Sequence, residues 1–352
     1  MTSRRAFLAA LMAVAAPKPS WADAGSPRWL ACAREADGGF ALFGIAGDGA
    51  DTFRLPLPAR GHAGAAHPTR PEAVAFARRP GTFALVLDCA TGALIRQLTP
   101  PEGMQFNGHG AYTSDGEILY TVEQRATDSR GFLGLWDAAY RRIGQIETGG
   151  IGPHEMLRLP GGASGDVFAV ANGGIATDPS DRTKLNLPDM APSLVYVEGD
   201  AIAEQVALDP ALHFASIRHL AQEDGTLAFA MQWEGPADRI VPLLGLHRRG
   251  AAPILASAPG PEQALMQGYA GSVAFSQGEV AITSPRGGRM HRFDAQGGFL
   301  GATTRADICG LAPCPGGFLT TDGGGGVLRV TEGHARPLGL RPRAWDNHIV
   351  TL

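Results

Sequence analysis

Residues 106–122 read FNGHGAYTSDGEILYTV, and this stretch holds the pattern from which the fold is inferred. A polar segment with a histidine, Asn107–Gly110, comes first, and a short apolar run, Ile118–Val122, follows it. The residues between them include Ser, Asp and Gly, which favour tight turns. The pattern predicts a short β-strand that ends in a turn and is followed by a second strand.

Short apolar runs of the same kind recur along the chain after residue 27. They are four to eight residues long, rich in Val, Leu, Phe and Ile, and bounded by Gly, Asp, Asn or Pro; examples are Phe40–Ile45, Phe83–Leu87, Val167–Ala171 and Leu194–Val197. No stretch shows sustained helical periodicity. An all-β fold is therefore expected, as a sandwich, a barrel or a propeller.

Internal repetition favours the propeller. Seven polar segments, several of them with a histidine, precede strand-like runs: Ala66–Pro68, Asn107–Gly110, Gly152–Glu155, Ser216–His219, Tyr269–Ser272, Asp307–Gly310 and Asp346–His348. Counted from residues 67, 109, 154, 219, 272, 309 and 348, the intervals are 37 to 53 residues, apart from one of 65. A four-stranded blade takes roughly 40 to 50 residues. We predict a seven-bladed β-propeller, with a sandwich as the alternative, and interpret Gly173–Pro192 as an inserted loop.

The two ends of the chain are expected to close the ring together. After the last predicted blade start only Ile349–Leu352 remains, which is enough for one strand. Three strands near the N-terminus, Trp29–Ala33, Phe40–Ile45 and Thr52–Leu57, can pair with it. Such pairing leaves no open sheet edge at either terminus.

The N-terminus resembles an export signal. Residues 3–8 read SRRAFL, an uncharged apolar run extends to Ala16, and Ala22–Ala24 has the form of a cleavage site. The paired arginines Arg4 and Arg5 are typical of twin-arginine signals, with a general secretory signal as the alternative. We expect residues 1–24 to be this signal peptide, residues 25–352 to form one domain, and the protein to be periplasmic.

Charge and cysteine content exclude some classes of function. Removal of residues 1–24 would leave 30 − 3 = 27 basic and 34 − 1 = 33 acidic residues, a formal charge of −6 without any basic run, so nucleic acid is not an expected partner. No later segment is apolar and long enough for a transmembrane helix, and a monomer is expected. The cysteines are expected to be buried thiols; Cys309 with Cys314, or Cys32 with Cys89, are the alternative disulfides.

The histidines of the predicted blade starts are candidate metal ligands. In a propeller these segments converge near one mouth of the central channel, which would gather His67, His109, His154, His219 and His348. Neutral imidazole binds iron, copper and zinc. We predict a metal site at His109, His154, His219 and His348, with Glu155 and Arg218 beside it. The alternative is that each histidine only stabilises a turn.

Two further segments carry candidate ligand-binding residues. Asn172 lies where the inserted loop begins, and long loops on a rigid scaffold often bind ligands, although Asn172 could instead hold the loop in place. Arg286 lies in the turn Ser284–Gly288 and could bind a carboxylate or a phosphate. Familiar catalytic patterns are missing: His154-Glu155 lacks the second histidine of a zinc protease, for example.

Several of these segments, taken together and in order, resemble the domain-of-unknown-function family fifteen-thirteen. The motifs that carry the resemblance are Arg78–Thr82, Phe106–Gly110, Thr113–Tyr120, Gly149–Glu155, Ala171–Ile175, Ser216–His219, Ser284–Gly287 and Asp307–Gly310. The resemblance runs from about residue 28 to the C-terminus. It implies an exported propeller of unestablished activity that is often encoded beside imelysin-like periplasmic iron-uptake proteins.

Two classes of function remain open at this point. The first is a non-enzymatic accessory of metal (iron) acquisition that binds a metal, a chelate or another iron-uptake protein at the channel mouth. The alternative is a propeller enzyme, either a lactonase-like hydrolase or a metal-dependent oxidoreductase. A pure interaction scaffold with structural histidines would differ from both by binding no metal.

Overall fold

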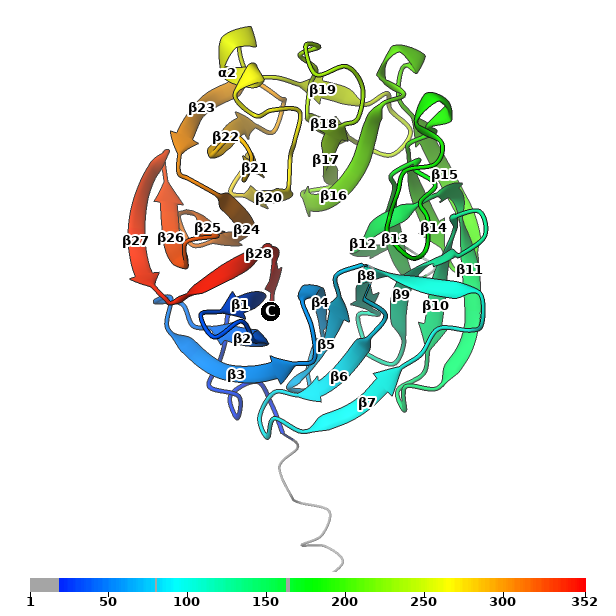
Figure 1. Cartoon of the computed structure of the whole chain (residues 1–352), viewed down its shortest axis with the longest axis vertical. Helices are drawn as coiled ribbons and strands as arrows, with labels where there is room; N and C mark the ends of the chain where they lie inside the picture. Colours follow the sequence, from blue (N-terminus) through cyan, green and yellow to red (C-terminus); the bar gives the residue numbers. More distant parts are fainter. Residues whose placement is uncertain (1–18, 80, 163–164) are drawn as a thin grey trace, which may run out of the picture.

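Seven antiparallel sheets of four strands each surround a central axis in the computed structural model, which describes residues 19–79, 81–162 and 165–352 (Figure 1). The predicted seven-bladed β-propeller is therefore confirmed. The predicted signal sequence up to Lys18 lies outside the described residues. The described helices are short: η1 (Leu187–Asp189), η2 (Pro210–Leu212) and α2 (Gly260–Ala264). No described helix is long and apolar enough to cross a membrane.

Each blade begins with a strand beside the axis and continues outwards. The first blade consists of β4 (Gly61–Ala66), β5 (Glu72–Ala77), β6 (Ala84–Asp88) and β7 (Leu94–Leu98). The second consists of β8 (Met104–Tyr112), β9 (Leu119–Arg125), β10 (Arg130–Trp136) and β11 (Arg142–Ile151). The third consists of β12 (Pro153–Gly162), β13 (Gly165–Asn172), β14 (Ser193–Glu198) and β15 (Ala201–Ala207). The fourth blade consists of β16 (Ala215–Glu223), β17 (Thr226–Trp233), β18 (Leu244–His247) and β19 (Ile254–Ala256). The fifth consists of β20 (Ser272–Ser276), β21 (Glu279–Ser284), β22 (Arg289–Asp294) and β23 (Phe299–Thr304). The sixth consists of β24 (Ile308–Cys314), β25 (Gly317–Asp322), β26 (Gly326–Thr331) and β27 (His334–Leu340).

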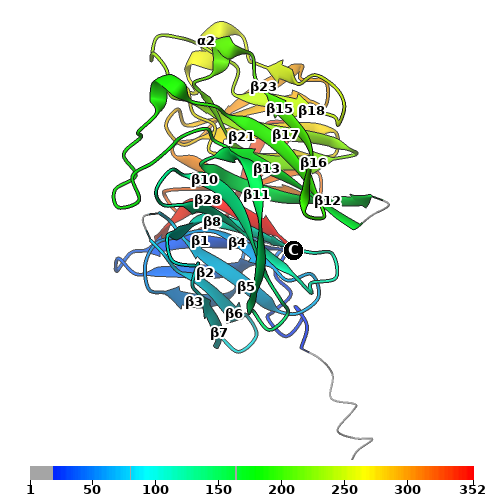
Figure 2. The ribbon, with the colours of Figure 1, turned by 90° about the vertical axis from the view of Figure 1, so that its right-hand side faces the viewer.

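The seventh blade joins the two ends of the described chain. Its inner strand is β28 (Arg343–Thr351), and β1 (Trp29–Glu35), β2 (Phe40–Ile45) and β3 (Asp51–Leu57) follow outwards. Strand β28 pairs antiparallel with β1 and lies against it in the side view (Figure 2). The predicted closure is confirmed, and β28 begins earlier in the sequence than the predicted strand did.

Apolar side chains between the blades form the core. Strands near the axis pack against neighbouring blades with both faces, as the continuous burial of Ser272–Ser276 shows. The largest cluster includes Tyr196, Phe229 and Phe293. All four cysteines are buried free thiols, as expected, and neither of the alternative disulfides forms.

Six of the seven inner strands are interrupted by a β-bulge close to the axis. The pairing register shifts between the members of each of these pairs: Gly61 and Gly64 in β4, Phe106 and Gly110 in β8, Pro153 and Met156 in β12, Ile217 and His219 in β16, Ile308 and Leu311 in β24, Trp345 and Ile349 in β28. Strand β20 alone pairs without such a shift. A bulge turns side chains away from the regular alternation of a strand, so residues at these shifts can point into the channel.

One predicted blade start was wrong. The sequence placed a start at Ala66–Pro68, but β4 begins at Gly61 and ends at Ala66. His67 therefore follows the inner strand. Its Nδ1 atom accepts hydrogen bonds from the backbone N–H groups of Thr69 and Arg70, so it stabilises a turn.

Candidate functional site

Five imidazole rings from five blades meet in the central channel. They belong to His62 on β4, His109 on β8, His154 on β12, His219 on β16 and His348 on β28, and we call them the histidine cluster. Neighbouring ring centroids are 4.4 to 5.0 Å apart: 4.4 Å for His62 with His348, 5.0 Å for His62 with His109, 4.9 Å for His109 with His154, 4.8 Å for His154 with His219 and 4.6 Å for His219 with His348.

The bulges explain this convergence locally. All five rings lie on or beside a register shift, where the backbone does not alternate regularly. In β8 the bulge depends on Gly108, which has a φ of 95°. A Cβ atom at this position would lie 2.7 Å from Cδ2 of His62, so only glycine allows His62 and His109 to approach each other.

Two nitrogen atoms of the cluster, Nε2 of His109 and Nε2 of His348, are buried and have no hydrogen-bond partner among the described residues. Two sets of three histidines, His62 with His109 and His348, and His109 with His154 and His219, offer nitrogen atoms that lie within 4.8 Å of one another. Around an ion with bonds of about 2.1 Å, ligand atoms are roughly 3 to 4 Å apart, so small side-chain shifts complete either set.

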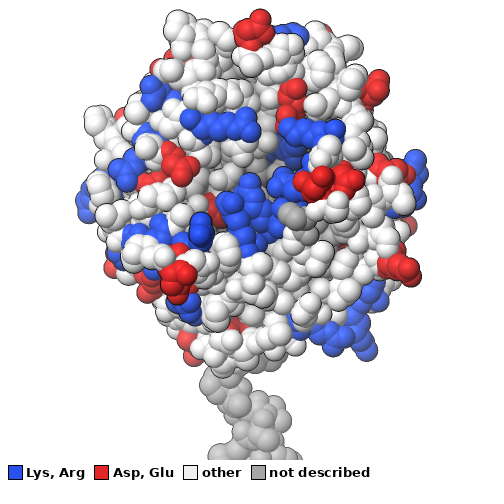
Figure 3. Space-filling view, in the orientation of Figure 1, with Lys and Arg blue, Asp and Glu red and all other residues white. Residues whose placement is uncertain are grey.

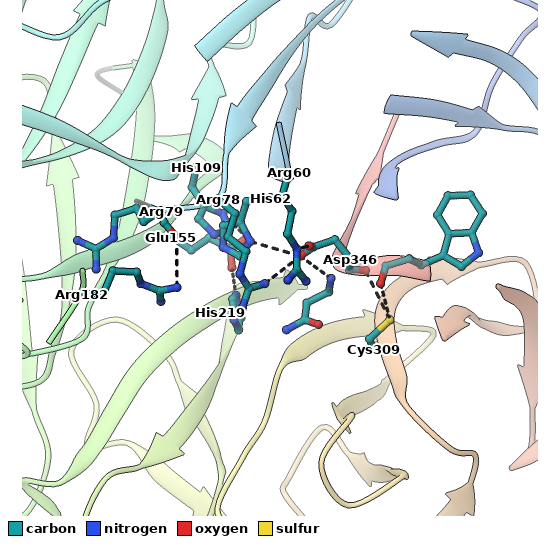
Figure 4. Close-up of polar contacts among 12 residues, drawn as sticks. Arg60, His62, Arg78, Arg79, His109, Glu155, Arg182, His219, Cys309 and Asp346 are labelled. Carbon is teal, nitrogen blue, oxygen red and sulfur yellow. Dashed lines mark hydrogen bonds and ion pairs between the residues drawn. The ribbon is translucent and has the colours of Figure 1, made fainter. Parts of the chain in front are cut away.

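A carboxylate orients one side of the cluster. Oε2 of Glu155 lies 3.0 Å from Nδ1 of His219 and also accepts a hydrogen bond of 3.1 Å from the backbone N–H of Leu220 (Figure 4). Oε1 of Glu155 is 3.9 Å from Nδ1 of His109. A carboxylate that accepts from one ring nitrogen directs the other nitrogen and makes it more basic, as is common around metal-binding histidines.

Asp346 lies on the other side of the cluster. Its Oδ2 atom accepts a 2.7 Å hydrogen bond from Arg60, while its Oδ1 atom lies 3.3 Å from Arg78 and 3.4 Å from Nδ1 of His62 (Figure 4). Burial of this carboxyl group opposes its ionisation, but His62, Arg78 and Arg60 together hold its pKa below the usual range. Asp346 therefore remains an anion beside the cluster.

Four histidines of the cluster, His62, His109, His154 and His348, are neutral near pH 7. Burial lowers the pKa of His62 to about 4, although Asp346 acts in the opposite direction. Burial also holds the pKa values of His109, His154 and His348 well below the usual value, and neighbouring imidazoles add to the effect. Neutral imidazole is the form that binds metal ions.

Two cavities adjoin the cluster from opposite ends of the inner strands. The first, which we call the wide cavity, has a volume of about 570 Å³ and lies towards the strands' C-terminal ends. Small side chains and one carboxylate form much of its wall, namely Ala65, Ala111, Glu155, Ala221, Ala274 and Ala312. Trp21, which precedes the predicted cleavage site, also lines this cavity and donates a hydrogen bond of 3.0 Å to the His67 carbonyl.

The second cavity, the basic pocket, has a volume of about 200 Å³ and lies at the N-terminal ends of the inner strands. Its lining contains six cationic side chains, Arg78, Arg79, Arg182, Lys184, Arg218 and Arg286, together with His62, His154 and His219 of the cluster. Figure 3 shows Lys and Arg side chains gathered around the hollow at the centre of this face. The pocket therefore joins a strongly positive surface to the histidines.

The structure brings most of the predicted site residues together. His109, His154, His219 and His348 belong to one cluster, Glu155 contacts it, and Arg218 and Arg286 line the basic pocket. The inserted loop runs between β13 and β14, over the range predicted.

Asn172 lies outside the site, and His67 lies outside the histidine cluster although it lines the wide cavity. Asn172 is fully buried and lines neither cavity; its amide bonds the side chain and carbonyl of Thr148 and the hydroxyl of Ser193, so it holds the start of the loop in place. The ring of His67 packs instead against Tyr112, with 5.1 Å between the ring centroids.

Sequence reasoning missed His62, Asp346 and most of the arginines. The pair Gly61-His62 repeats the pair Gly108-His109 and could have indicated that His62 belongs to the cluster. Arg79 lies in the motif Arg78–Thr82, but the motif does not assign it a ligand, and nothing in the local sequence distinguishes Arg182 from other arginines.

Similar solved structures share the fold. "Kuenenia stuttgartiensis Hydrazine Synthase" matches with a TM-score of 0.56 and 10% identity, covering 88% of this chain and 95% of that chain. A chain of "Crystal Structure of Mitotic Checkpoint Complex" matches with a TM-score of 0.53 and 10% identity, covering 80% of this chain and 77% of that one. At such low identity the likeness concerns the fold alone. A search of curated proteins finds no match.

A family model with the description "Protein of unknown function (DUF1513)" matches residues 55–352. The match contains six complete blades, strand β28 and every residue of the histidine cluster and the basic pocket. It agrees with the resemblance that the sequence motifs indicated. The chain belongs to the DUF1513 family.

Proposed function

We propose that this propeller binds one first-row transition-metal ion, iron or copper, at the histidine cluster and acts as a non-enzymatic component of metal acquisition. The observation that carries the proposal is the meeting of five imidazoles from five blades in the channel. Bringing five such rings together leaves buried nitrogen atoms without partners, which costs free energy that a bound ion would offset.

The chemistry of the donors suits these metals. Imidazole nitrogen binds iron, copper, nickel and zinc, and affinity along the first-row divalent ions is greatest for copper. The implied neighbourhood of iron-uptake proteins favours iron as cargo, and such proteins are the proposed partners. Glu155 and Asp346 orient His219 and His62 from outside the cluster, in the way that carboxylates support histidine ligands elsewhere.

Binding, as opposed to turnover, is supported by the number of histidines. Catalytic metal sites keep an open coordination position for water or substrate, whereas closed sites hold the ion with protein atoms. Whichever set of three histidines holds the ion, the other two imidazoles of the cluster lie beside it and would fill the positions that three ligands leave open. A hydrolase or an oxidoreductase would need that open position.

The test is the metal content of protein recovered from the periplasmic fraction without a histidine tag. We expect about one ion per chain, and recovery from this fraction also checks the proposed location. His109 contributes to both sets of three ligands, so His109→Ala should weaken metal binding by about 100-fold or more. His67→Ala is the matched control and should bind as the unmodified protein does. No bound metal, even after Fe²⁺ or Cu²⁺ is added to the purified protein, would overturn the proposal.

A further inference from the structure

The basic pocket contains more positive charge than its own carboxylates can neutralise. Of the six cations that line it, Lys184 pairs with Glu234, and Arg78 pairs with Asp346 at 3.3 Å. Among the described residues, no carboxylate lies within ion-pair distance of the other four, Arg79, Arg182, Arg218 and Arg286. Glu234 is the one carboxylate in the described lining of the pocket.

The neutral contacts of these arginines hold them in place without neutralising them. Arg79 donates from Nη1 to Thr177 Oγ1 at 3.1 Å, and Arg286 lies over the ring of Tyr269, 4.4 Å from its centroid. The Nε atom of Arg218 is buried and has no hydrogen-bond partner in the part of the chain that the structure describes. An unpartnered guanidinium nitrogen beside a cavity indicates that its partner is a ligand.

The inserted loop builds one wall of this pocket. Residues 173–192 are anchored at several points: Thr177 contacts Arg79, the Pro179 carbonyl accepts from Gln105 at 3.1 Å, and Lys184 pairs with Glu234. Arg182 is thereby placed beside Arg79 and donates to its carbonyl at 3.4 Å. The loop adds two cations, Arg182 and Lys184, to the four that the rest of the chain places around the pocket.

Like charges crowd each other here. Burial, with Arg182 and Arg218 nearby, lowers the pKa of Arg79 to about 10. Burial also lowers the pKa of Arg182, and Arg78 contributes. A ligand that brings negative charge would relieve this repulsion.

We propose that the basic pocket is a binding site for a small multivalent oxyanion, one that presents carboxylate or phosphate oxygens to Arg79, Arg182, Arg218 and Arg286. Guanidinium groups recognise such oxygens through paired N–H donors. The volume of about 200 Å³ suits a small molecule that carries several anionic groups. Because His62, His154 and His219 line the same pocket, the bound anion lies directly against the histidine cluster. The site goes beyond metal binding, because the arginines need no metal to hold the anion.

The test uses metal-free protein and two probes, citrate and inorganic phosphate, in calorimetric titrations at low ionic strength. We expect one binding site for at least one probe, with affinity that falls as salt is added. Stronger binding of citrate identifies the natural ligand as a polycarboxylate, and stronger binding of phosphate identifies it as a phosphate compound. Binding of neither probe would overturn the proposal.

Two double variants locate the site. Arg79→Gln with Arg182→Gln should weaken binding of the better probe by about 30-fold or more, since each substitution removes a charged hydrogen-bond donor. Arg96→Gln with Arg336→Gln changes the net charge equally at exposed positions on β7 and β27 and should leave the affinity unchanged. Equal loss in both double variants would reduce the effect to general charge attraction and would refute the site.

The same titration separates this proposal from the metal site. His109→Ala should lose metal but keep anion binding, because His109 is not in the lining of the basic pocket. Anion binding without any metal binding would overturn the proposed function alone. Metal binding without anion binding would overturn this inference alone.

Discussion

The wide cavity and the basic pocket adjoin the same histidine cluster, yet their walls have opposite character. The basic pocket, at the N-terminal ends of the inner strands, contains six cations, whereas alanines form much of the wall of the wide cavity at the C-terminal ends. The bulges lie between the two cavities, where the basic lining gives way to the alanine-rich lining. Regular pairing resumes on the side of the wide cavity, where small side chains let neighbouring inner strands approach each other.

The fifth and sixth blades, which contribute no histidine to the cluster, show how the bulges relate to its composition. Strand β20 has no register shift and contributes no imidazole to the cluster. Strand β24 is bulged but carries Cys309 and Gly310 at the shift. All five histidines of the cluster therefore lie at a bulge, and the residue at the bulge decides what the blade contributes.

The wide-cavity half of β28 can be removed to test how much the closure stabilises the ring. Deletion of Ile349–Leu352 removes the partners of Trp29, Leu30 and Ala31 and leaves an open edge on β1. We expect aggregation, or a melting temperature lower by about 10 °C or more, since several kcal/mol are lost. Deletion of Leu352 alone is the control and should change little. An unchanged melting curve for the longer deletion would show that closure does not depend on this pairing.

Acid should lower the free energy of unfolding of the metal-free protein, because His62 of the histidine cluster is protonated more easily in the unfolded chain. The folded pKa of His62 is about 4, whereas its unfolded value is about 6.5, so the unfolded chain takes up protons first as the pH falls. Stability is complete above about pH 6.5 and declines towards about pH 4. Between pH 7 and pH 5 we expect a loss of about 2 kcal/mol from His62 alone.

Chemical denaturation at several pH values measures this decline. His62→Asn should make the dependence on pH shallower, whereas His334→Asn, at an exposed position on β27, should not. A slope that both variants leave unchanged would show that His62 is not the group responsible.

The unpaired positive charge of the basic pocket should lower the free energy of unfolding when no ligand is bound. Arg218→Met removes a guanidinium with an unpaired buried Nε atom, and we expect the free energy of unfolding to rise by about 1 kcal/mol. Arg158, which lines the wide cavity, pairs with Asp166 at 3.6 Å, so Arg158→Met should have no stabilising effect. If Arg218→Met destabilises the ligand-free protein, Arg218 contributes to folding and not only to binding.

Much of the architecture could be predicted from the sequence alone. Short Val-, Leu- and Phe-rich runs with Gly and Asp turns dictate strands and tight turns, because these are local preferences of the backbone. Their spacing gave the number of blades, and the short strand left at the C-terminus indicated how the ring closes. The histidines at four blade starts were recognisable for the same reason: equivalent places in a repeat lie at equivalent distances from the axis.

Only the tertiary structure decided which side chains meet in the channel. His67 and His62 are close in sequence, but a single register shift in β4 places His62 in the cluster, and the strand's length carries His67 beyond it. Arg79 and Arg182 come together because the inserted loop folds across the pocket, which is a long-range contact without a local signal. Bulges and loop anchoring depend on packing between blades, so only the folded ring determines which residues form the site. The ring itself could be predicted from the local sequence pattern.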